Sequence, residues 1–179
     1  MTTPDFILDL REKIGSAELW LPGTTAIVLR AIRSGADLPL EPPRGWSRKI
    51  DDPREVEVLC VKRADNGNWT PITGIVDPRE APAVAAVRET KEEADVDARV
   101  DRLIGVDVVG PVAYPNGDVS SYLDTAFVLE WLEGEPNPAD GENSETRFVR
   151  ADELPEMNAR FQRLIAKALS GSVIADFED

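Results

Sequence analysis

Histidine is absent from this chain of 179 residues, and cysteine occurs once, as Cys60. Neither a histidine base nor a histidine metal ligand is therefore available, and a single cysteine excludes an internal disulfide. The sequence also lacks the ~18 to 20 consecutive apolar residues of a membrane span. Its N-terminus has no basic segment followed by an apolar run, so no secretion signal is predicted. We expect a cytoplasmic protein with no membrane partner.

Positive charge is scarce: 20 lysines and arginines stand against 34 aspartates and glutamates, a net charge of -14 at pH 7. This balance argues against binding a nucleic acid polymer through its phosphates. A small polyanionic substrate would also be repelled unless cations intervene locally. The hydrophobic content of 42% is that of an ordinary globular protein. The charge pattern therefore favours a bound metal if the substrate carries phosphates.

The length predicts one domain over residues 1–179, with an N-terminal helical extension at 1–18 and a loop insertion at 34–54. Periodicity and turn residues predict a short N-terminal helix with Thr3 as its cap. They also predict a helix over 82–94 and a C-terminal helix over 153–171 that Gly171 stops. Strands are predicted at 24–32, 55–63, 69–76, 98–110, 120–132 and 146–151. This order, with strands between two major helices, indicates an α/β protein.

The helix over 82–94 carries three glutamates, Glu89, Glu92 and Glu93, within one turn. Like charges at this spacing repel by about 0.2–0.5 kcal/mol per pair. At ~100° per residue Val84, Val87 and Ala94 are expected on one side of this helix and the three glutamates on the opposite side. An acidic helix face can simply be solvated, but a bound divalent cation would relieve the repulsion.

Six residues of this region stand at the spacing of the Nudix box, Gly-x5-Glu-x7-Arg-Glu-U-x-Glu-Glu-x-Gly-U, where U is a bulky aliphatic residue. They are Gly74, Glu80, Arg88, Glu89, Glu92 and Glu93. The chain therefore resembles the Nudix hydrolases, particularly actinobacterial ones, over roughly residues 20–170. Two positions depart from the box: Thr90 replaces an aliphatic residue, and Asp95 replaces a glycine that ends the helix with positive φ. Aspartate tolerates that conformation better than most residues.

The resemblance implies a Nudix fold, an α/β/α sandwich with a mixed central β-sheet. It also implies metal-dependent hydrolysis of a nucleoside diphosphate linked to another group. Glu89, Glu92 and Glu93 are then the metal ligands, and oxygen ligands suit Mg²⁺ or Mn²⁺. Nudix proteins often form dimers, so the N-terminal helix is a candidate homodimer interface.

Three alternatives stay open. The first is a Nudix-like domain that binds a nucleotide or ADP-ribose without cleaving it. The second is an isomerase of allylic diphosphates on the same fold, although its chemistry uses histidine, which is absent. The third is an acidic cation-binding module, for which the chain lacks a calcium loop of the required spacing.

Several residues receive specific roles from the motif. Arg88 is expected to hold Glu89 or Glu80 in place through charge-assisted hydrogen bonds. Glu80 stands before the helix, where a structural role at the helix N-terminus and a role at the substrate or metal are both open. Gly74 is expected to allow a close backbone approach near the substrate. Outside the motif, the resemblance implies that a glutamate from a later loop activates the water, and Glu142 is preferred over Glu145 for this role.

Aromatic and turn residues are weaker candidates for substrate binding. Trp69 and Trp46 are candidates for stacking on a base, although an aromatic residue is more often a packing element. Tyr114, Asn116 and Asp118 are candidates for substrate contact, but Asn-Gly is also a strong turn signal. Trp20, Trp131 and Cys60 are interpreted as packing residues.

Overall fold

The computed structural model describes residues 4–32, 49–114, 116–139 and 141–177. Thr3, Trp46 and most of the predicted loop at 34–54 lie outside these residues. The helices are α1 (Asp5–Ile14), α2 (Pro82–Ala94) and α3 (Ala159–Leu169), with a short 3₁₀ turn at Pro53–Glu55. The strands are β1 (Leu19–Ala31), β2 (Val56–Arg63), β3 (Trp69–Thr70), β4 (Ile72–Ile75), β5 (Asp97–Ala113), β6 (Val119–Glu133), β7 (Asn143–Arg150) and β8 (Asp176–Phe177).

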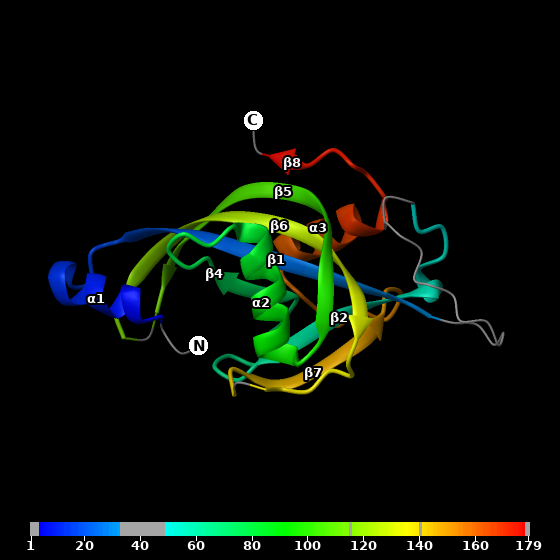
Figure 1. Cartoon of the computed structure of the whole chain (residues 1–179), viewed down its shortest axis with the longest axis horizontal. Coiled ribbons are helices and arrows are strands. Elements are labelled where there is room, and N and C mark those ends of the chain that lie inside the picture. The colour runs from blue at the N-terminus through cyan, green and yellow to red at the C-terminus, as the bar shows by residue number, and fades with distance from the viewer. Residues whose placement is uncertain (1–3, 33–48, 115, 140, 178–179) are drawn as a thin grey trace.

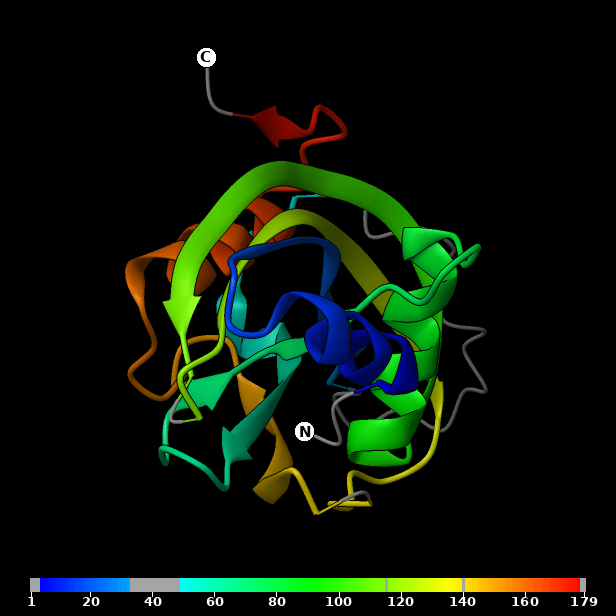
Figure 2. The same cartoon turned by 90° about the vertical axis from the view of Figure 1, so that its left-hand side faces the viewer.

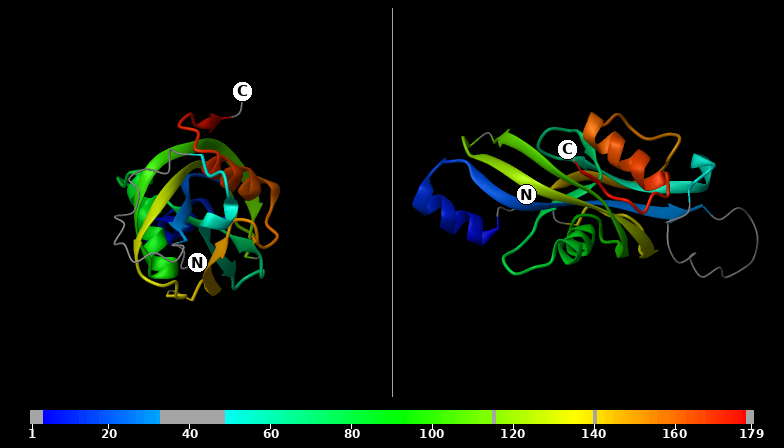
Figure 3. Two further views of the ribbon diagram at one scale, coloured as in Figure 1. Left: turned by 90° about the vertical axis from the view of Figure 1, so that its right-hand side faces the viewer. Right: turned by 90° about the horizontal axis from the view of Figure 1, so that it is seen from above.

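All eight strands belong to one mixed sheet. Its main path runs β3-β2-β1-β6-β5-β8, while β4 pairs with β1 and β7 pairs with β2. The central strand β1 is parallel to β6 but antiparallel to β2 and β4. Helices α2 and α3 lie on opposite faces of this sheet (Figures 1 and 3). The predicted α/β/α sandwich with a mixed central sheet is confirmed.

Strand β1 is apolar on both faces because both faces are covered. Ile27 and Leu29 pack into the core cluster that contains the buried side of α3. Ala26 and Val28 pack into the cluster that contains the buried side of α2. Successive side chains of a strand point to opposite faces, so a strand between two helices reads as an unbroken hydrophobic run. Cys60 is fully buried on the α3 side, as predicted.

Helix α1 lies across one end of the sheet (Figure 2). It buries Ile7 against Leu19, Leu21 and Ile75. The predicted N-terminal helix is therefore present and packs on strands β1 and β4. None of the described helices is long and apolar enough to cross a membrane.

Several predictions of local structure are wrong, among them the start of the last predicted strand, which lies at Asn143 rather than residue 146. The first strand begins at Leu19 rather than residue 24, because residues 19–23 pair with β6. The C-terminal helix begins at Ala159 rather than residue 153, where Asn158 caps it by accepting from the Phe161 N–H at 2.9 Å. Pro155 also disfavours helical geometry in the residue before it. Trp20 is not packed, since its residue surface is 59% exposed.

Candidate active site on helix α2

The start of α2 is attached to the centre of the sheet. The Thr24 hydroxyl donates to the Pro82 carbonyl at 3.3 Å, and Pro82 occupies the first turn, where a missing N–H costs no helical bond. The helix ends at Asp95, whose φ of 52° and ψ of 31° are left-handed. The expectation that Asp95 replaces the box glycine in this conformation is confirmed.

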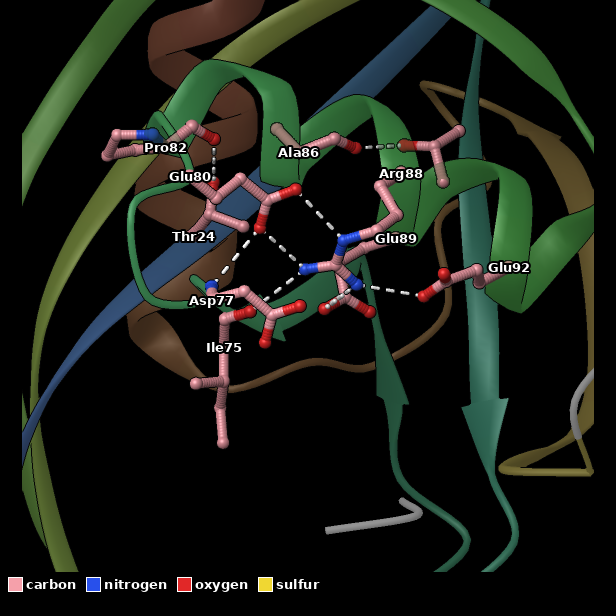
Figure 4. A network of polar contacts seen from close by, with 10 residues as sticks. Thr24, Ile75, Asp77, Glu80, Pro82, Ala86, Arg88, Glu89 and Glu92 are labelled. Atoms are coloured by element: carbon pink, nitrogen blue, oxygen red, sulfur yellow. Dashed lines mark hydrogen bonds and ion pairs between the residues drawn. The ribbon is translucent and has the colours of Figure 1, made fainter. Parts of the chain in front are cut away.

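Arg88 organises the acidic side chains around it (Figure 4). Its Nε and Nη2 donate to the two carboxylate oxygens of Glu80 at 3.0 and 2.9 Å. Its Nη1 donates to Glu89 at 2.9 Å and to Glu92 at 2.8 Å, and Nη2 also donates to the Ile75 carbonyl at 3.1 Å. These bonds use all five N–H donors of the guanidinium. The predicted role of Arg88 is confirmed for both Glu80 and Glu89.

Glu80 belongs to the loop that leads into α2. Besides its two bonds from Arg88, its carboxylate accepts from the Asp77 N–H at 3.1 Å. These hydrogen bonds, chiefly those from Arg88, lower its pKa from the usual value of 4.5. The contacts of Glu80 are those of a residue that fixes the loop and Arg88, which is the structural role that the sequence left open.

Gly74 is required by the approach of Glu89. A Cβ atom at residue 74 would stand 2.1 Å from Glu89 Cδ and 2.2 Å from its Oε1, far inside any allowed contact. The Glu89 carboxylate therefore packs directly over the backbone of β4. The predicted close approach at Gly74 is confirmed, and its partner is the side chain of Glu89.

This packing leaves Glu89 in an unfavourable electrostatic position. Burial, with smaller contributions from the charges of Glu92 and Glu142, raises its pKa from 4.5 to about 7 in spite of the opposing effect of Arg88. Glu92, by contrast, has a half-exposed side chain. A cation beside Glu89 would favour its ionised form.

Glu93 is not on the exposed side of α2, so the prediction that all three glutamates oppose the core is wrong. It is only 4% exposed, whereas Val84, on the side predicted to oppose the glutamates, is 58% exposed. Val87 and Ala94 of that predicted side do pack in the core cluster beside α2. The buried face of α2 runs instead through Ala86, Thr90 and Glu93. The departure at Thr90 is accommodated because its hydroxyl donates to the Ala86 carbonyl at 2.7 Å.

Glu93 is met by Asn143, a residue that the sequence analysis did not single out. Asn143 Nδ2 donates to Glu93 Oε2 at 2.9 Å, and both side chains are buried. In the sequence Asn143 follows Glu142 within a polar segment of loop composition, where asparagine normally indicates a turn. Only its neighbour Glu142 could have drawn attention to it.

Glu142 and Glu145 lie on the chain that begins β7. The Glu142 carbonyl accepts from the Ala64 N–H at 2.9 Å. The negative charge of Glu142 is one of the causes that raise the pKa of Glu89. Glu145 pairs with Lys62 across the strands and forms an ion pair with Arg147 at 3.5 Å.

The remaining candidates for substrate contact have partners other than Arg88. Trp69 packs against the core cluster on the α3 side, with the Arg147 guanidinium 4.5 Å from its ring centre. The Tyr114 hydroxyl is 2.5 Å from that of Tyr122. Asn116 bonds to Asp118 within the turn, in agreement with the turn interpretation of these residues.

The side chains around α2 are of the chemical type that binds a hard divalent cation. It consists of carboxylate oxygens, and burial together with neighbouring negative charge disfavours the ionised form of Glu89 until a cation compensates it. Within the described residues, no group of three or more acidic, cysteine or histidine side chains already converges on one point. Arg88 instead donates to Glu89 and Glu92, while Asn143 donates to Glu93. Binding of an ion by all three glutamates would therefore require Glu89 and Glu92 to turn away from Arg88.

The fold and the site together define an α/β/α sandwich in which an arginine-ordered acidic helix covers one face of a mixed sheet. A family model described as NUDIX domain matches residues 49–169, more than half of the chain. The chain therefore belongs to the Nudix family, as its sequence motif predicted.

Individual relatives agree with this assignment. A MutT-like protein of Streptomyces ambofaciens is 32% identical over 83 residues, which cover 42% of this chain and 54% of that protein. The match thus spans about half the length of that relative. The fold is similar to that of an ADP-ribose pyrophosphatase from Streptococcus suis, with a TM-score of 0.57, 19% identity, and 88% and 96% of the two chains covered. It is also similar to a UDP-X diphosphatase, with a TM-score of 0.60, 14% identity, and 98% and 74% covered.

Proposed function

We propose that this protein is a metal-dependent pyrophosphohydrolase that cleaves the diphosphate linkage of a nucleoside diphosphate derivative, such as a nucleoside triphosphate or ADP-ribose. The observation that carries the proposal is the position of Glu89. It is buried over Gly74 in a field of negative charge that leaves its pKa near 7, an arrangement that a divalent cation would stabilise. Folding this carboxylate into place without such a ligand has a cost in stability.

Each residue of the site has a task in this proposal. Glu89, Glu92 and Glu93 hold Mg²⁺ or Mn²⁺, which neutralises phosphate charge and lowers the pKa of a bound water. Arg88 orients Glu89 and Glu92 and is itself oriented by Glu80. Glu142 accepts the proton of the attacking water. The nucleotide is a small molecule, and the acidic surface disfavours longer nucleic acids.

The test is hydrolysis of a panel of nucleoside triphosphates, ADP-ribose, dinucleotides and nucleotide sugars with and without Mg²⁺. We expect metal-dependent release of a phosphate product, and we expect Glu93→Gln to lower turnover by orders of magnitude. Glu145→Gln, at the ion pair with Arg147, is the matched control and should retain most of the turnover. Wild-type turnover in Glu93→Gln would contradict the assignment.

A second candidate is a domain that binds the nucleotide and does not cleave it. It is favoured by the bonds of Arg88, which engage Glu89 and Glu92. The same panel separates the two functions, because a binder would protect the protein against thermal unfolding without consuming the ligand. Cytoplasmic location and homodimer formation remain predictions of the sequence.

A further inference from the structure

A buried hydrogen bond joins the acidic turn of α2 to the start of β7. Asn143 Nδ2 donates to Glu93 Oε2 at 2.9 Å, between two residues that are 5% and 4% exposed. A hydrogen bond between side chains is electrostatically stronger where water is excluded. The Asn143 amide therefore fixes the direction in which the Glu93 carboxylate points.

The side chain of Asn143 reaches α2 because of an irregularity in the sheet. In β7, Arg147 and Val149 point to the α3 side, whereas Phe148 packs on the α2 side. Strict alternation would therefore send Asn143 to the α3 side as well. The register shifts between Lys62, which pairs with Glu145, and Arg63, which pairs with Asn143. The extra residue is Ser144, and this β-bulge turns Asn143 towards Glu93.

The bulge is held by its own hydrogen bonds. The Ser144 hydroxyl donates to the Lys62 carbonyl at 3.2 Å, and the Ala64 N–H donates to the Glu142 carbonyl at 2.9 Å. These bonds fix the backbone on both sides of Asn143. Glu142, the proposed base, thus lies next to the residue that orients Glu93, the proposed metal ligand.

We propose that Asn143 is a positioning residue that sets the Glu93 carboxylate relative to Glu142, so that ion binding and water activation depend on the bulge in β7. This inference rests on the proposed function. It adds Asn143, a residue outside the Nudix box, to the residues that support the reaction, and it gives the bulge in β7 a function. Asn143 acts through Glu93 and contacts neither ion nor substrate.

The test is the affinity of the full chain for Mn²⁺, measured by titration calorimetry with wild type and Asn143→Ala. Loss of an amide that orients a metal ligand typically lowers metal affinity by about 10–100-fold, and we expect a decrease in this range. The control is Asn137→Ala, at an exposed asparagine, which should bind Mn²⁺ as wild type does. Unchanged affinity in Asn143→Ala, with an active wild type, would overturn the inference and leave the proposed function intact.

A second variant, Asn143→Asp, keeps the side-chain size and places a negative charge beside Glu93. Because this variant also lacks the amide donor, we expect its unfolding temperature to fall without metal and to rise on adding Mn²⁺ by less than that of wild type. A merely structural role would lower both temperatures equally, and that result would also overturn the inference. Wild-type protein that neither binds Mn²⁺ nor hydrolyses any nucleotide would overturn the proposed function itself.

Discussion

Helices α2 and α3 cover the two faces of one sheet, but they do so with different side chains. Helix α3 buries Phe161, Leu164 and Ile165, whereas α2 buries the small residues Ala85, Ala86 and Ala94. Full burial of a large apolar side chain contributes about 1.5–3 kcal/mol, far more than a methyl group does. The small residues let α2 approach the sheet closely enough for Glu89 to lie over Gly74.

The arginines of the two helices also have different partners. Arg160 of α3 donates to Asp124 and Thr25 on the sheet, so this arginine attaches the helix to the strands. Arg88 of α2 instead donates mainly to carboxylates of its own helix and of the loop before it. Helix α3 is thus expected to contribute stability. Helix α2 is expected to hold negative charges in an arrangement that a bound ligand would stabilise.

The largest expected effect on stability is at α3. Leu164→Ala removes a side chain that is 3% exposed and packed near Gly105, and such changes cost about 2–5 kcal/mol of unfolding free energy. Val84→Ala on the exposed side of α2 should change it by less than ~0.5 kcal/mol. Urea unfolding of both variants measures the contrast. Equal losses would mean that the two helices do not differ in this way.

A smaller effect on stability, with a larger effect on activity, is expected at Gly74→Ala. The new Cβ would overlap the Glu89 carboxylate and displace it, at about 1–3 kcal/mol. We expect a substantial loss of kcat/KM and weaker Mn²⁺ binding. Gly23→Ala, where the nearest atom is at 3.4 Å, is the matched control. Full activity in Gly74→Ala would show that Glu89 need not occupy this position.

The smallest expected effects are changes of stability with pH. Two carboxylates that accept from Arg88, Glu80 and Glu89, have pKa values shifted in opposite directions. The pKa of Glu80 is lowered, so its ionised form is favoured by folding. This stabilisation is complete above pH 4.5 and is lost as the pH falls through the lower, folded-state pKa. The pKa of Glu89 is raised to about 7, so its ionisation opposes folding increasingly between pH 4.5 and 7.

Removal of each carboxyl charge separates these two contributions. Without metal, Glu89→Gln should gain unfolding temperature relative to wild type at pH 8, and the gain should vanish near pH 4. Glu80→Gln should lose unfolding temperature at pH 8, and its loss should shrink below pH 4. Thermal unfolding in EDTA across this pH range measures both. Parallel curves for the two variants would contradict the opposite signs of the shifts.

Much of the fold follows from local patterns in the sequence. The long buried strand around Ala26–Leu29, the helix over Pro82–Ala94 and the left-handed Asp95 each have a local signature that the structure confirms. The boundaries that failed did so for non-local reasons. Leu19 becomes a strand residue through its pairing with Ser120 of β6, a partner about 100 residues away.

The acidic helix shows where local reasoning ends. The spacing of Glu89, Glu92 and Glu93 predicts one acidic face, yet Glu93 is buried because Asn143 meets it from β7. Val84 is exposed for the complementary reason: the sheet faces another side of α2. Helical periodicity determines which residues share a face, but not which face the sheet covers.

The sequence by itself determined the membership in the Nudix family, the alternation of strands and helices, and the residue types that gather at α2, because these depend on spacing and composition along the chain. Only the tertiary structure decided that Arg88 holds both Glu80 and Glu89, that Glu89 lies over Gly74, and that a bulge turns Asn143 towards Glu93. Those contacts depend on strand register and on the distance between helix and sheet. Both quantities arise from packing between segments distant in sequence.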